Sequence, residues 1–215
     1  MSTLVMESEM ADLTLYLLRH GESVANVENV FAARKVDLPL SDVGIQQVTM
    51  QVELLKTIEF SAMYSSPLLR ARQTAEIVSQ QCGLEVTFSE ALREVDVGIL
   101  DGESQDAPQQ WAVHEEIIKK WEQGLASIGF PGGETLNDIE DRFRGFLDGL
   151  EGKGQRRILV VGHCLFFMAV IWLFCENHGR TLEDGHMGRA HLSIIRKSGD
   201  RFRMLKFNIS PEILG

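Results

Sequence analysis

The feature of this sequence that most constrains its fold is a short apolar run that ends abruptly in a basic pair and a glycine. Residues 13–18 are rich in leucine and have the length of a buried parallel β-strand. The tripeptide Arg19-His20-Gly21 follows directly, and Ser23 and Asn26 then suit the first turn of a helix. Open α/β sheets bind ligands beyond the carboxyl ends of such strands, so we expect a ligand site here.

The residue types after this strand favour an anion as the ligand. Arg19 offers a planar fork of donors that suits a phosphate, and His20 can act as a nucleophile, a base or a ligand. Gly21 lets the backbone turn tightly. For the tripeptide alone, a plain strand end with two solvated side chains is the more common outcome, because short motifs recur by chance. The rest of the chain therefore has to decide between the two interpretations.

The overall charge restricts the class of partner. The formal net charge of the 215 residues is −10, which argues against a nucleic-acid-binding protein because such proteins need a basic face. An anionic substrate would meet overall repulsion. A phosphate site must therefore be a local concentration of Arg and His, as at Arg19-His20.

Cysteine usage and hydropathy indicate the compartment. The three cysteines are odd in number and widely spaced, which does not suggest a disulfide framework or a zinc knuckle. No secretory signal opens the chain, and the apolar run 165–175 is shorter than the roughly 20 residues that span a membrane. We expect a cytoplasmic protein without a membrane partner, in which 165–175 forms a core helix and residues 1–12 form a flexible leader.

Strand and helix patterns alternate along the chain, which predicts an α/β fold with a mostly parallel sheet. We expect residues 93–133, rich in Gly and Pro, to leave the sheet as a partial cap over its ligand edge, and two alternating C-terminal segments to form a hairpin. The predicted strands are 13–18, 60–65, 84–88, 157–162, 191–196 and 202–207, and the predicted helices are 41–57, 68–82, 109–122, 135–150 and one that starts at 164.

A second strand repeats the opening pattern. Residues 157–162 form an apolar strand, and His163 follows before the helix that begins at Cys164. Two strands that end in histidine can bring both imidazoles to one edge of the sheet. The start of the second helix would also aim free N–H groups at an anion.

Two further stretches contribute candidate side chains. Arg70 and Arg72 follow the strand at 60–65 and lie on different helix faces, so we expect at most one of them in the site and the other solvated or paired with Glu76. Glu94 follows the strand at 84–88 and could donate a proton if burial raised its pKa, although an isolated carboxylate is more commonly a surface group.

Together these residues resemble the histidine phosphatase superfamily, also called the phosphoglycerate-mutase-like family. The matches run in family order over nearly the whole chain from Leu13. They are Arg19-His20-Gly21-Glu22 with Asn26, Pro39-Leu40-Ser41 with Gly44 and Gln47, Ser65-Ser66-Pro67 with Arg70-Ala71 and Gln73-Thr74-Ala75, Leu92 with Glu94 and Gly98, Pro131-Gly132-Gly133-Glu134-Thr135, Val161-Gly162-His163, and Asn208 before Leu214. The resemblance implies a three-layer α/β/α sandwich, with one domain at 13–215 and a small helical cap at about 99–133.

The resemblance also implies roles for individual residues. His20 would attack the phosphoryl group and form a phosphohistidine without metal or cofactor, and Glu94 would act as general acid and base. Arg19, Arg70 and His163 would bind the phosphoryl oxygens. The implied substrate-binding set is Arg19, Gly21, Ser23, Asn26, Arg34, Arg70 and Cys164. The remaining histidines show no ligand spacing that would pair them with His20 in a metal site.

Three positions depart from the family pattern. Cys164 stands where the family has Gly after the second histidine, so its backbone N–H would face the phosphate and its thiol could be open to oxidation. Arg34 stands in a segment where many relatives carry Gln-Gly, and we expect it to touch the substrate. Arg189 stands where relatives often carry Asn, which leaves its role open.

The resemblance is compatible with three functions. Residues 101–131 contain no Tyr or Arg and carry only Lys119-Lys120, whereas mutases of the family hold a phosphoglycerate there with Tyr, Lys and paired Arg. We therefore expect a phosphatase acting on a small phosphorylated metabolite, with phosphate or another oxyanion able to occupy the site. A cofactor-dependent phosphoglycerate mutase and a non-catalytic phospho-ligand-binding protein are the alternatives. The oligomeric state is open, a homodimer included.

Overall fold

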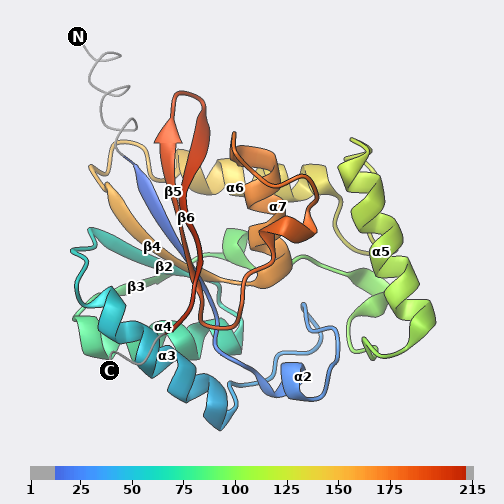
Figure 1. Cartoon of the computed structure of the whole chain (residues 1–215), viewed down its shortest axis with the longest axis horizontal. Coiled ribbons are helices and arrows are strands. Elements are labelled where there is room, and N and C mark those ends of the chain that lie inside the picture. Colours follow the sequence, from blue (N-terminus) through green and yellow to red (C-terminus); the bar gives the residue numbers. More distant parts are fainter. Residues whose placement is uncertain (1–12, 212–215) are drawn as a thin grey trace.

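A six-stranded mixed sheet forms the centre of the computed structural model, which describes residues 13–211 (Figure 1). The strand order is β3-β2-β4-β1-β5-β6, in which the first four strands are mutually parallel and the last two form the predicted antiparallel hairpin at one edge. The strands are β1 (Thr14–Arg19), β2 (Ala62–Ser65), β3 (Val86–Phe88), β4 (Arg157–Gly162), β5 (Leu192–Ser198) and β6 (Arg201–Ile209).

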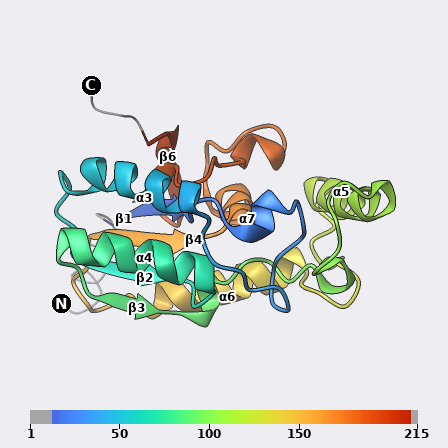
Figure 2. The ribbon, with the colours of Figure 1, turned by 90° about the horizontal axis from the view of Figure 1, so that it is seen from below.

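Helices cover both faces of this sheet, which confirms the predicted three-layer arrangement (Figure 2). Helices α3 (Asp42–Leu55) and α4 (Leu69–Cys82) pack on one face, and α6 (Leu136–Asp148) and α7 (Cys164–Phe174) pack on the other. The short α2 (Val24–Val27) follows β1, and α5 (Pro108–Glu122) lies beyond the end of the sheet. Three 3₁₀ turns are η1 (Glu90–Leu92), η2 (Gly98–Leu100) and η3 (Glu183–Gly185).

The central strands are largely apolar, since both of their faces are buried. In β1, Leu15 and Leu17 point toward α6 and α7, whereas Leu18 points toward α3 and α4. In β4, Ile158 and Leu159 divide between the two faces in the same way. These two strands pair in register, from Thr14 opposite Arg157 to Arg19 opposite Gly162. The register places His20 and His163 immediately beyond adjacent strand ends.

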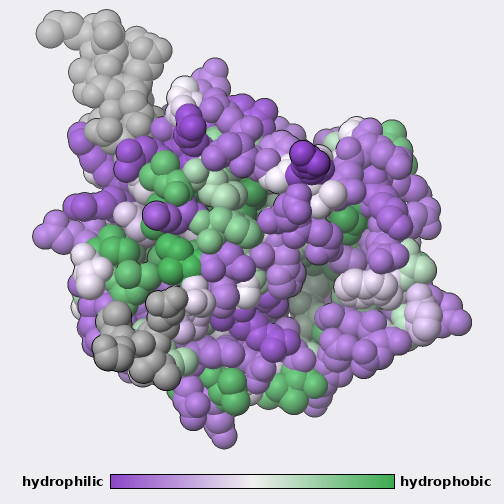
Figure 3. All heavy atoms as spheres, in the orientation of Figure 1, coloured by the Kyte–Doolittle hydropathy of each residue, from purple (hydrophilic) through white to green (hydrophobic). Residues whose placement is uncertain are grey.

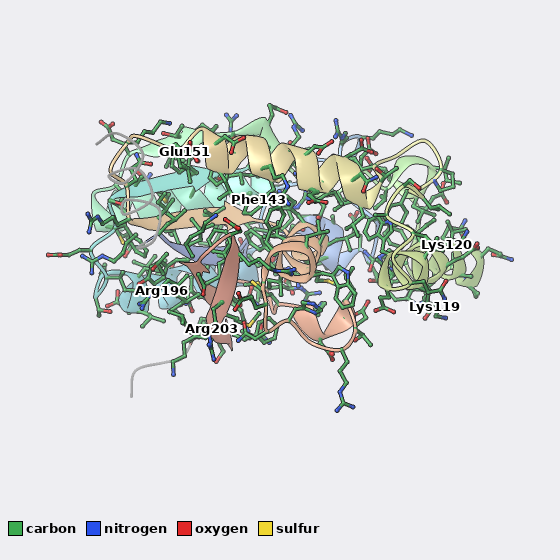
Figure 4. The ribbon with its side chains drawn as sticks, turned by 90° about the horizontal axis from the view of Figure 1, so that it is seen from above. Lys119, Lys120, Phe143, Glu151, Arg196 and Arg203 are labelled. Atoms are coloured by element: carbon green, nitrogen blue, oxygen red, sulfur yellow. The ribbon has the colours of Figure 1, made fainter. Side chains whose placement is uncertain are left out.

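Helix α7 is a core helix, as its composition predicts. Most of its residues are buried, and Phe166 and Phe174 contact Phe143 of α6 edge-on at ring distances of 5.9 and 4.9 Å. Phe143 is labelled in Figure 4. Within residues 13–211, no helix combines the length and the apolar character needed to cross a membrane.

Helix boundaries follow the local signals with one exception. Ser41 caps α3 by accepting the N–H of Gly44, Thr135 and Asp138 form a capping box on α6, and Gly83 ends α4 in the left-handed conformation. The helix predicted at 68–82 begins one residue later, at Leu69, and its N-cap residue Leu68 has no side chain that could cap it. Its first N–H is accepted instead by Asp37 from a distant loop at 2.7 Å.

Two glycines stand where the backbone of α3 crosses close to the turn after β1, at positions where a larger residue would not fit. A Cβ atom on Gly21 would lie 2.5 Å from the carbonyl oxygen of Gly44, and one on Gly44 would lie 2.0 Å from the carbonyl oxygen of Glu22. Gly44 weakens the helical propensity of α3 locally, but only glycine lets this helix approach the turn after β1. The crossing fixes the backbone on which His20 sits.

The segment expected as a cap, 99–133, contains part of η2 and all of α5. Ile117, Ile118 and Trp121 of α5 join the larger core cluster, and Trp121 packs edge-on against Phe130 at 5.5 Å. One expectation falls outside the described residues, namely the flexible leader at 1–12.

Candidate active site

A cavity of about 430 Å³ opens at the carboxyl ends of β1 and β4. Figure 3 shows the surface hollowed between α7 and α5, above α2. This is the edge of the sheet at which the sequence predicts a ligand site. Its lining includes Arg19, His20, Arg70 and Glu94, which come from three separate parts of the chain.

His20 lies directly after β1 and is held in one tautomer. Its Nδ1 is 2.6 Å from the carbonyl oxygen of Gly21, so Nδ1 carries the proton and donates it to that oxygen. Its Nε2 then has a free lone pair, toward which Arg70 donates its Nε–H at 3.3 Å. The imidazole is buried with Nε2 as its reactive atom.

The surroundings keep His20 neutral. Burial, followed by the positive charges of Arg70 and Arg19, holds the pKa of His20 well below its ordinary value of 6.5. A neutral imidazole with an accessible lone pair is the form required of a nucleophile.

His163 lies beside His20, with ring centroids 5.2 Å apart. Its Nε2 is 2.8 Å from the hydroxyl oxygen of Ser66, and that oxygen already accepts the N–H of Leu68. The hydroxyl proton is therefore free to be donated to Nε2, which leaves the proton of the His163 ring on Nδ1. Burial and the nearby charge of Arg70 also hold the pKa of His163 well below 6.5.

Arg19 and Arg70 bring two guanidinium groups into the buried end of the cavity. Arg19 donates from Nη1 to the carbonyl oxygen of Met187, and Arg70 donates from Nη2 to the carbonyl oxygen of Ala32 at 2.9 Å. Each group keeps a buried nitrogen that has no hydrogen-bond partner among the described residues, Nε in Arg19 and Nη1 in Arg70. The Nδ1 of His163 is in the same condition. Unpaired buried donors are costly, and an oxyanion beside His20 would satisfy them.

Glu94 binds the N-terminal N–H groups of α7, where the sequence predicts an external anion. Its carboxylate accepts the N–H groups of Phe166 at 2.8 Å and Leu165 at 3.3 Å, in the first turn of α7, and the N–H of Val95 at 2.9 Å. The positive end of the helix therefore binds a carboxylate of the protein itself at these two amides. The contacts fix Glu94 in the wall of the cavity.

Asp101 organises the loop that forms another wall. Its two carboxylate oxygens accept four consecutive backbone N–H groups, from residues 33 to 36, at 3.1, 2.7, 2.6 and 3.4 Å. The preceding residue, Ala32, supplies the carbonyl that binds Arg70. Asp101, from the predicted cap, thus fixes the loop that positions Arg70.

Three of the predicted binding residues have local structural contacts. Asn26 and Ser23 line the cavity, but the side-chain oxygen of Asn26 accepts from both the N–H and the hydroxyl of Ser23 in the capping box of α2. Gly21 does not line the cavity, and its carbonyl and N–H contact His20 and Thr74 instead. Gly21 and Ser23 therefore position the loop that carries His20.

The placement of Arg34 corrects an expectation. Arg34 does not line the cavity, because its guanidinium turns to Asp96 at 3.0 Å and Glu134 at 3.6 Å. Cys164 does line it, and burial raises the pKa of its thiol, which disfavours the reactive thiolate.

The two arginines of α4 separate as their spacing predicts. Arg70 is buried in the site, whereas Arg72 is exposed and lies over the ring of Phe88 at 4.9 Å instead of pairing with Glu76. Arg189, whose role the sequence left open, lines the cavity and pairs with Glu22 at 3.0 Å.

The outer wall of the cavity is formed by residues that the sequence did not indicate. Phe31, Trp111 and His114 line it with nearly parallel rings, and Glu183 and His186 come from the segment around η3. The i,i+3 spacing of Trp111 and His114 on α5 indicates a shared helix face, but nothing local shows that this face turns to His20. Trp121 and Phe130 of the same segment are buried in the core, whereas Trp111 remains 39% exposed.

Residues 13–211 contain no group of three or more His, Cys, Asp or Glu side chains that could hold a metal ion. The donors at the buried end of the cavity are guanidinium and imidazole N–H groups, which suit an anion.

Comparisons with known proteins show the family to which the chain belongs. The profile of the histidine phosphatase superfamily (branch 1) matches residues 15–210. "Putative phosphoserine phosphatase 2" of Hydrogenobacter thermophilus is 26% identical over 197 residues, which cover 90% of this chain and 94% of the relative. "Probable phosphoglycerate mutase GpmB" of Citrobacter koseri is 34% identical over 152 residues, which cover 70% and 69%. The solved structure of a mycobacterial glucosyl-3-phosphoglycerate phosphatase with VO3 has a TM-score of 0.74 at 24% identity and covers 92% of this chain and 100% of that one.

Proposed function

The chain belongs to the histidine phosphatase superfamily, and from this premise we propose that it is a phosphatase that hydrolyses a small-molecule phosphate monoester through a phosphohistidine on His20. Membership in the family supports phosphatase or mutase activity. The preference for a phosphatase rests on the absence of substrate-binding lysines from the cavity. Lys119 and Lys120 lie on α5, where they pair with Glu115 and Glu116, and neither lines the cavity (Figure 4).

The first chemical step is attack by His20. The Nε2 lone pair forms a bond to phosphorus while the bond between phosphorus and the ester oxygen breaks. The hydrogen bond from Nδ1 to the Gly21 carbonyl supports this step, because it orients the ring and stabilises the positive charge that develops on it. The lowered pKa of His20 keeps the attacking form populated at neutral pH.

The negative charge of the phosphoryl group is met by fixed donors. Arg19 Nε, Arg70 Nη1 and His163 Nδ1 are buried around His20 without hydrogen-bond partners among the described residues, and they are the observation that carries this proposal. Donors that are already oriented in a dry site need little reorganisation during the reaction. Removing one such donor typically costs on the order of 10²–10³ in kcat.

Glu94 is the proposed proton donor to the leaving alcohol. Its Oε2 has only the longer hydrogen bond, 3.3 Å from the N–H of Leu165, so this oxygen has capacity left for a proton. The alcohol leaves with the proton of Glu94. A water molecule then attacks the phosphohistidine and gives a proton to the same carboxylate, which releases phosphate and restores both groups.

The relative that is 34% identical keeps a phosphoglycerate mutase as the second candidate. The two activities share the phosphohistidine and differ in its fate, since a mutase returns the phosphoryl group to a glycerate. Incubation with 3-phosphoglycerate and a bisphosphoglycerate primer separates them. Isomerisation faster than release of phosphate would overturn the phosphatase proposal.

The direct test is hydrolysis of p-nitrophenyl phosphate in the presence of a chelator, together with detection of an acid-labile, alkali-stable phosphoryl label on the protein. We expect wild-type activity to survive the chelator and His20→Ala to lose both activity and label. His178→Ala is the matched control, because His178 also contacts the carbonyl of the glycine that follows it, at 2.7 Å, but does not line the cavity. Full activity in His20→Ala, or total loss with the chelator, would contradict the mechanism.

A further inference from the structure

The two ends of the cavity differ in chemistry, and the outer end indicates which alcohol the substrate carries. At the buried end, Arg19 and Arg70 surround His20. The outer end is lined by the rings of Phe31, Trp111 and His114 and by the apolar side chains of Leu165 and Met168. The phosphoryl group and its leaving alcohol therefore meet different surroundings.

The aromatic residues of the outer end form one cluster of nearly parallel rings. Trp111 and His114 stack at 5.0 Å with 21° between their planes, and Phe31 stacks on Trp111 at 6.2 Å with 23°. Burial lowers the pKa of His114 to about 4, so this ring is neutral at physiological pH and adds an apolar surface. Phe31 and His114 are buried in the cluster and Trp111 is 39% exposed, so the ring of Trp111 is the one on which a flat apolar group can stack.

The outer end contains no free cation among its lining residues. Arg189, the third arginine of the lining, already pairs with Glu22 at 3.0 Å. Burial, together with Arg19 and Arg189, lowers the pKa of His186, which favours its neutral form. No lysine lines the cavity. A carboxylate on the alcohol would find no unpaired cationic side chain there.

Negative charge lies at the rim of the outer end instead. Glu183 lines the cavity, and the carboxylate of Glu122 lies nearby, where it accepts the N–H of Leu182 at 2.7 Å. Partial burial and the neighbouring carboxylates of Glu122 and Glu115 raise the pKa of Glu183. A substrate carboxylate near Glu183 would add to this repulsion.

Resting on the proposed function, we propose that the substrate is a phosphate monoester whose alcohol carries an aromatic or other flat apolar group and no carboxylate. The apolar group packs against the cluster of Phe31, Trp111 and His114 through the exposed ring of Trp111, while the phosphoryl group lies against His20. This substrate class differs from a phosphoglycerate and from phosphoserine, which both carry a carboxylate close to the ester.

Two pairs of alkyl phosphates test the proposal on the wild-type protein. We expect kcat/KM for 2-phenylethyl phosphate to exceed that for ethyl phosphate by tenfold or more, on the order of what one apolar pocket contributes. We expect propyl phosphate to exceed 2-carboxyethyl phosphate by roughly tenfold. Equal values within both pairs, or a preference for 3-phosphoglycerate or phosphoserine over 2-phenylethyl phosphate, would overturn the proposal.

Two variants assign these preferences to residues. Trp111→Leu should reduce the preference for 2-phenylethyl over ethyl phosphate severalfold, and Phe88→Leu, which alters an exposed ring on β3 outside the cavity, should leave it unchanged. Glu183→Gln should raise kcat/KM for 2-carboxyethyl phosphate by roughly twofold to fivefold relative to propyl phosphate, a modest effect because water screens the rim. Glu176→Gln, an exposed acid outside the cavity, is its control.

The outcomes separate the substrate class from the reaction. Hydrolysis of all the esters without preference would overturn the substrate class alone and leave the phosphohistidine mechanism intact. Failure to hydrolyse any ester, with no phosphoryl label on His20, would overturn both proposals.

Discussion

The units that carry His20 and His163 have the same local pattern, a buried strand followed by histidine and then a helix, yet their histidines differ in what they can do. His20 donates from Nδ1 to the next carbonyl and leaves Nε2 open beside Arg70. His163 has its Nε2 bound to Ser66 and leaves Nδ1 without a partner. One ring offers a lone pair and the other offers a proton.

The helices after the two histidines differ as well. Helix α2 has four residues and is capped by its own Ser23 and Asn26, whereas α7 has eleven residues and two of its first N–H groups bind Glu94. The first unit therefore presents the proposed nucleophile, and the second fixes the proposed general acid beside it. The local pattern is shared, and contacts from elsewhere in the chain decide the chemical role of each copy.

Replacing each histidine in turn should produce the largest difference between the units. We expect His20→Ala to abolish turnover and phosphoryl labelling, because no other group can form the covalent intermediate. His163→Ala should lower kcat by on the order of 10²–10³ and still form the label, because it removes one donor to the phosphoryl oxygens. Steady-state kinetics and a quenched labelling experiment measure both. Loss of the label in folded His163→Ala would contradict the assignment.

Replacing the glycine next to each histidine by alanine should lower the free energy of unfolding more in the first unit than in the second. Alanine at Gly21 would meet the backbone oxygen of Gly44 at 2.5 Å, whereas alanine at Gly162 would meet the ring tip of Phe167 at 2.7 Å. A ring can rotate or shift, but a helix carbonyl can do so only with its helix. We expect Gly21→Ala to lower the free energy of unfolding by about 3 kcal/mol and Gly162→Ala by about 1 kcal/mol, measured by urea denaturation. Equal costs would show that the crossing with α3 is less rigid than these distances imply.

Removing the hydroxyl that orients His163 should affect only the second unit. Ser66→Ala leaves Nε2 of His163 without its partner, so the ring can change tautomer and lose the proton on Nδ1. We expect kcat to fall by about fivefold with unchanged phosphoryl labelling of His20, since an intramolecular hydrogen bond of this kind contributes about 1 kcal/mol. Ser79→Ala, which removes a hydroxyl bonded to the carbonyl of Leu84 away from the cavity, is the control. A fall in kcat no larger than that in this control would refute the orienting role of Ser66.

The free energy of unfolding should depend on pH in the same way for both strand–histidine–helix units, with each histidine contributing about 1 kcal/mol. Because the pKa values of His20 and His163 lie well below 6.5 in the folded protein, the unfolded chain binds more protons below pH 6.5. The free energy of unfolding should therefore decrease as pH falls from 6.5, with a slope of up to about 1.4 kcal/mol per pH unit for each histidine. His20→Asn and His163→Asn should each reduce this slope by a similar amount in urea denaturation at pH 7 and pH 5.5. An unchanged slope in either variant would show that its histidine is protonated in the folded state.

The sequence by itself determined the layers of the fold and the edge at which the site lies. Apolar runs such as 13–18 and 157–162 predict buried parallel strands, and the end of such a strand predicts the location of His20 and His163, because strand burial and chain direction are local properties. The cap residues Ser41, Gly83 and Thr135 likewise have local signals, and they end or start helices as predicted.

Only the tertiary structure decided what surrounds the histidines. Glu94 binds amides of α7 that are more than 70 residues away, Asp101 holds residues 33–36, and Arg34 turns away from the cavity toward Asp96 and Glu134. These contacts join loops to distant backbone groups, and they depend on how the packed layers bring those groups together. The wall formed by Phe31, Trp111 and His114 arises in the same way. A sequence pattern records which face of a helix is apolar, and only packing decides what that face meets.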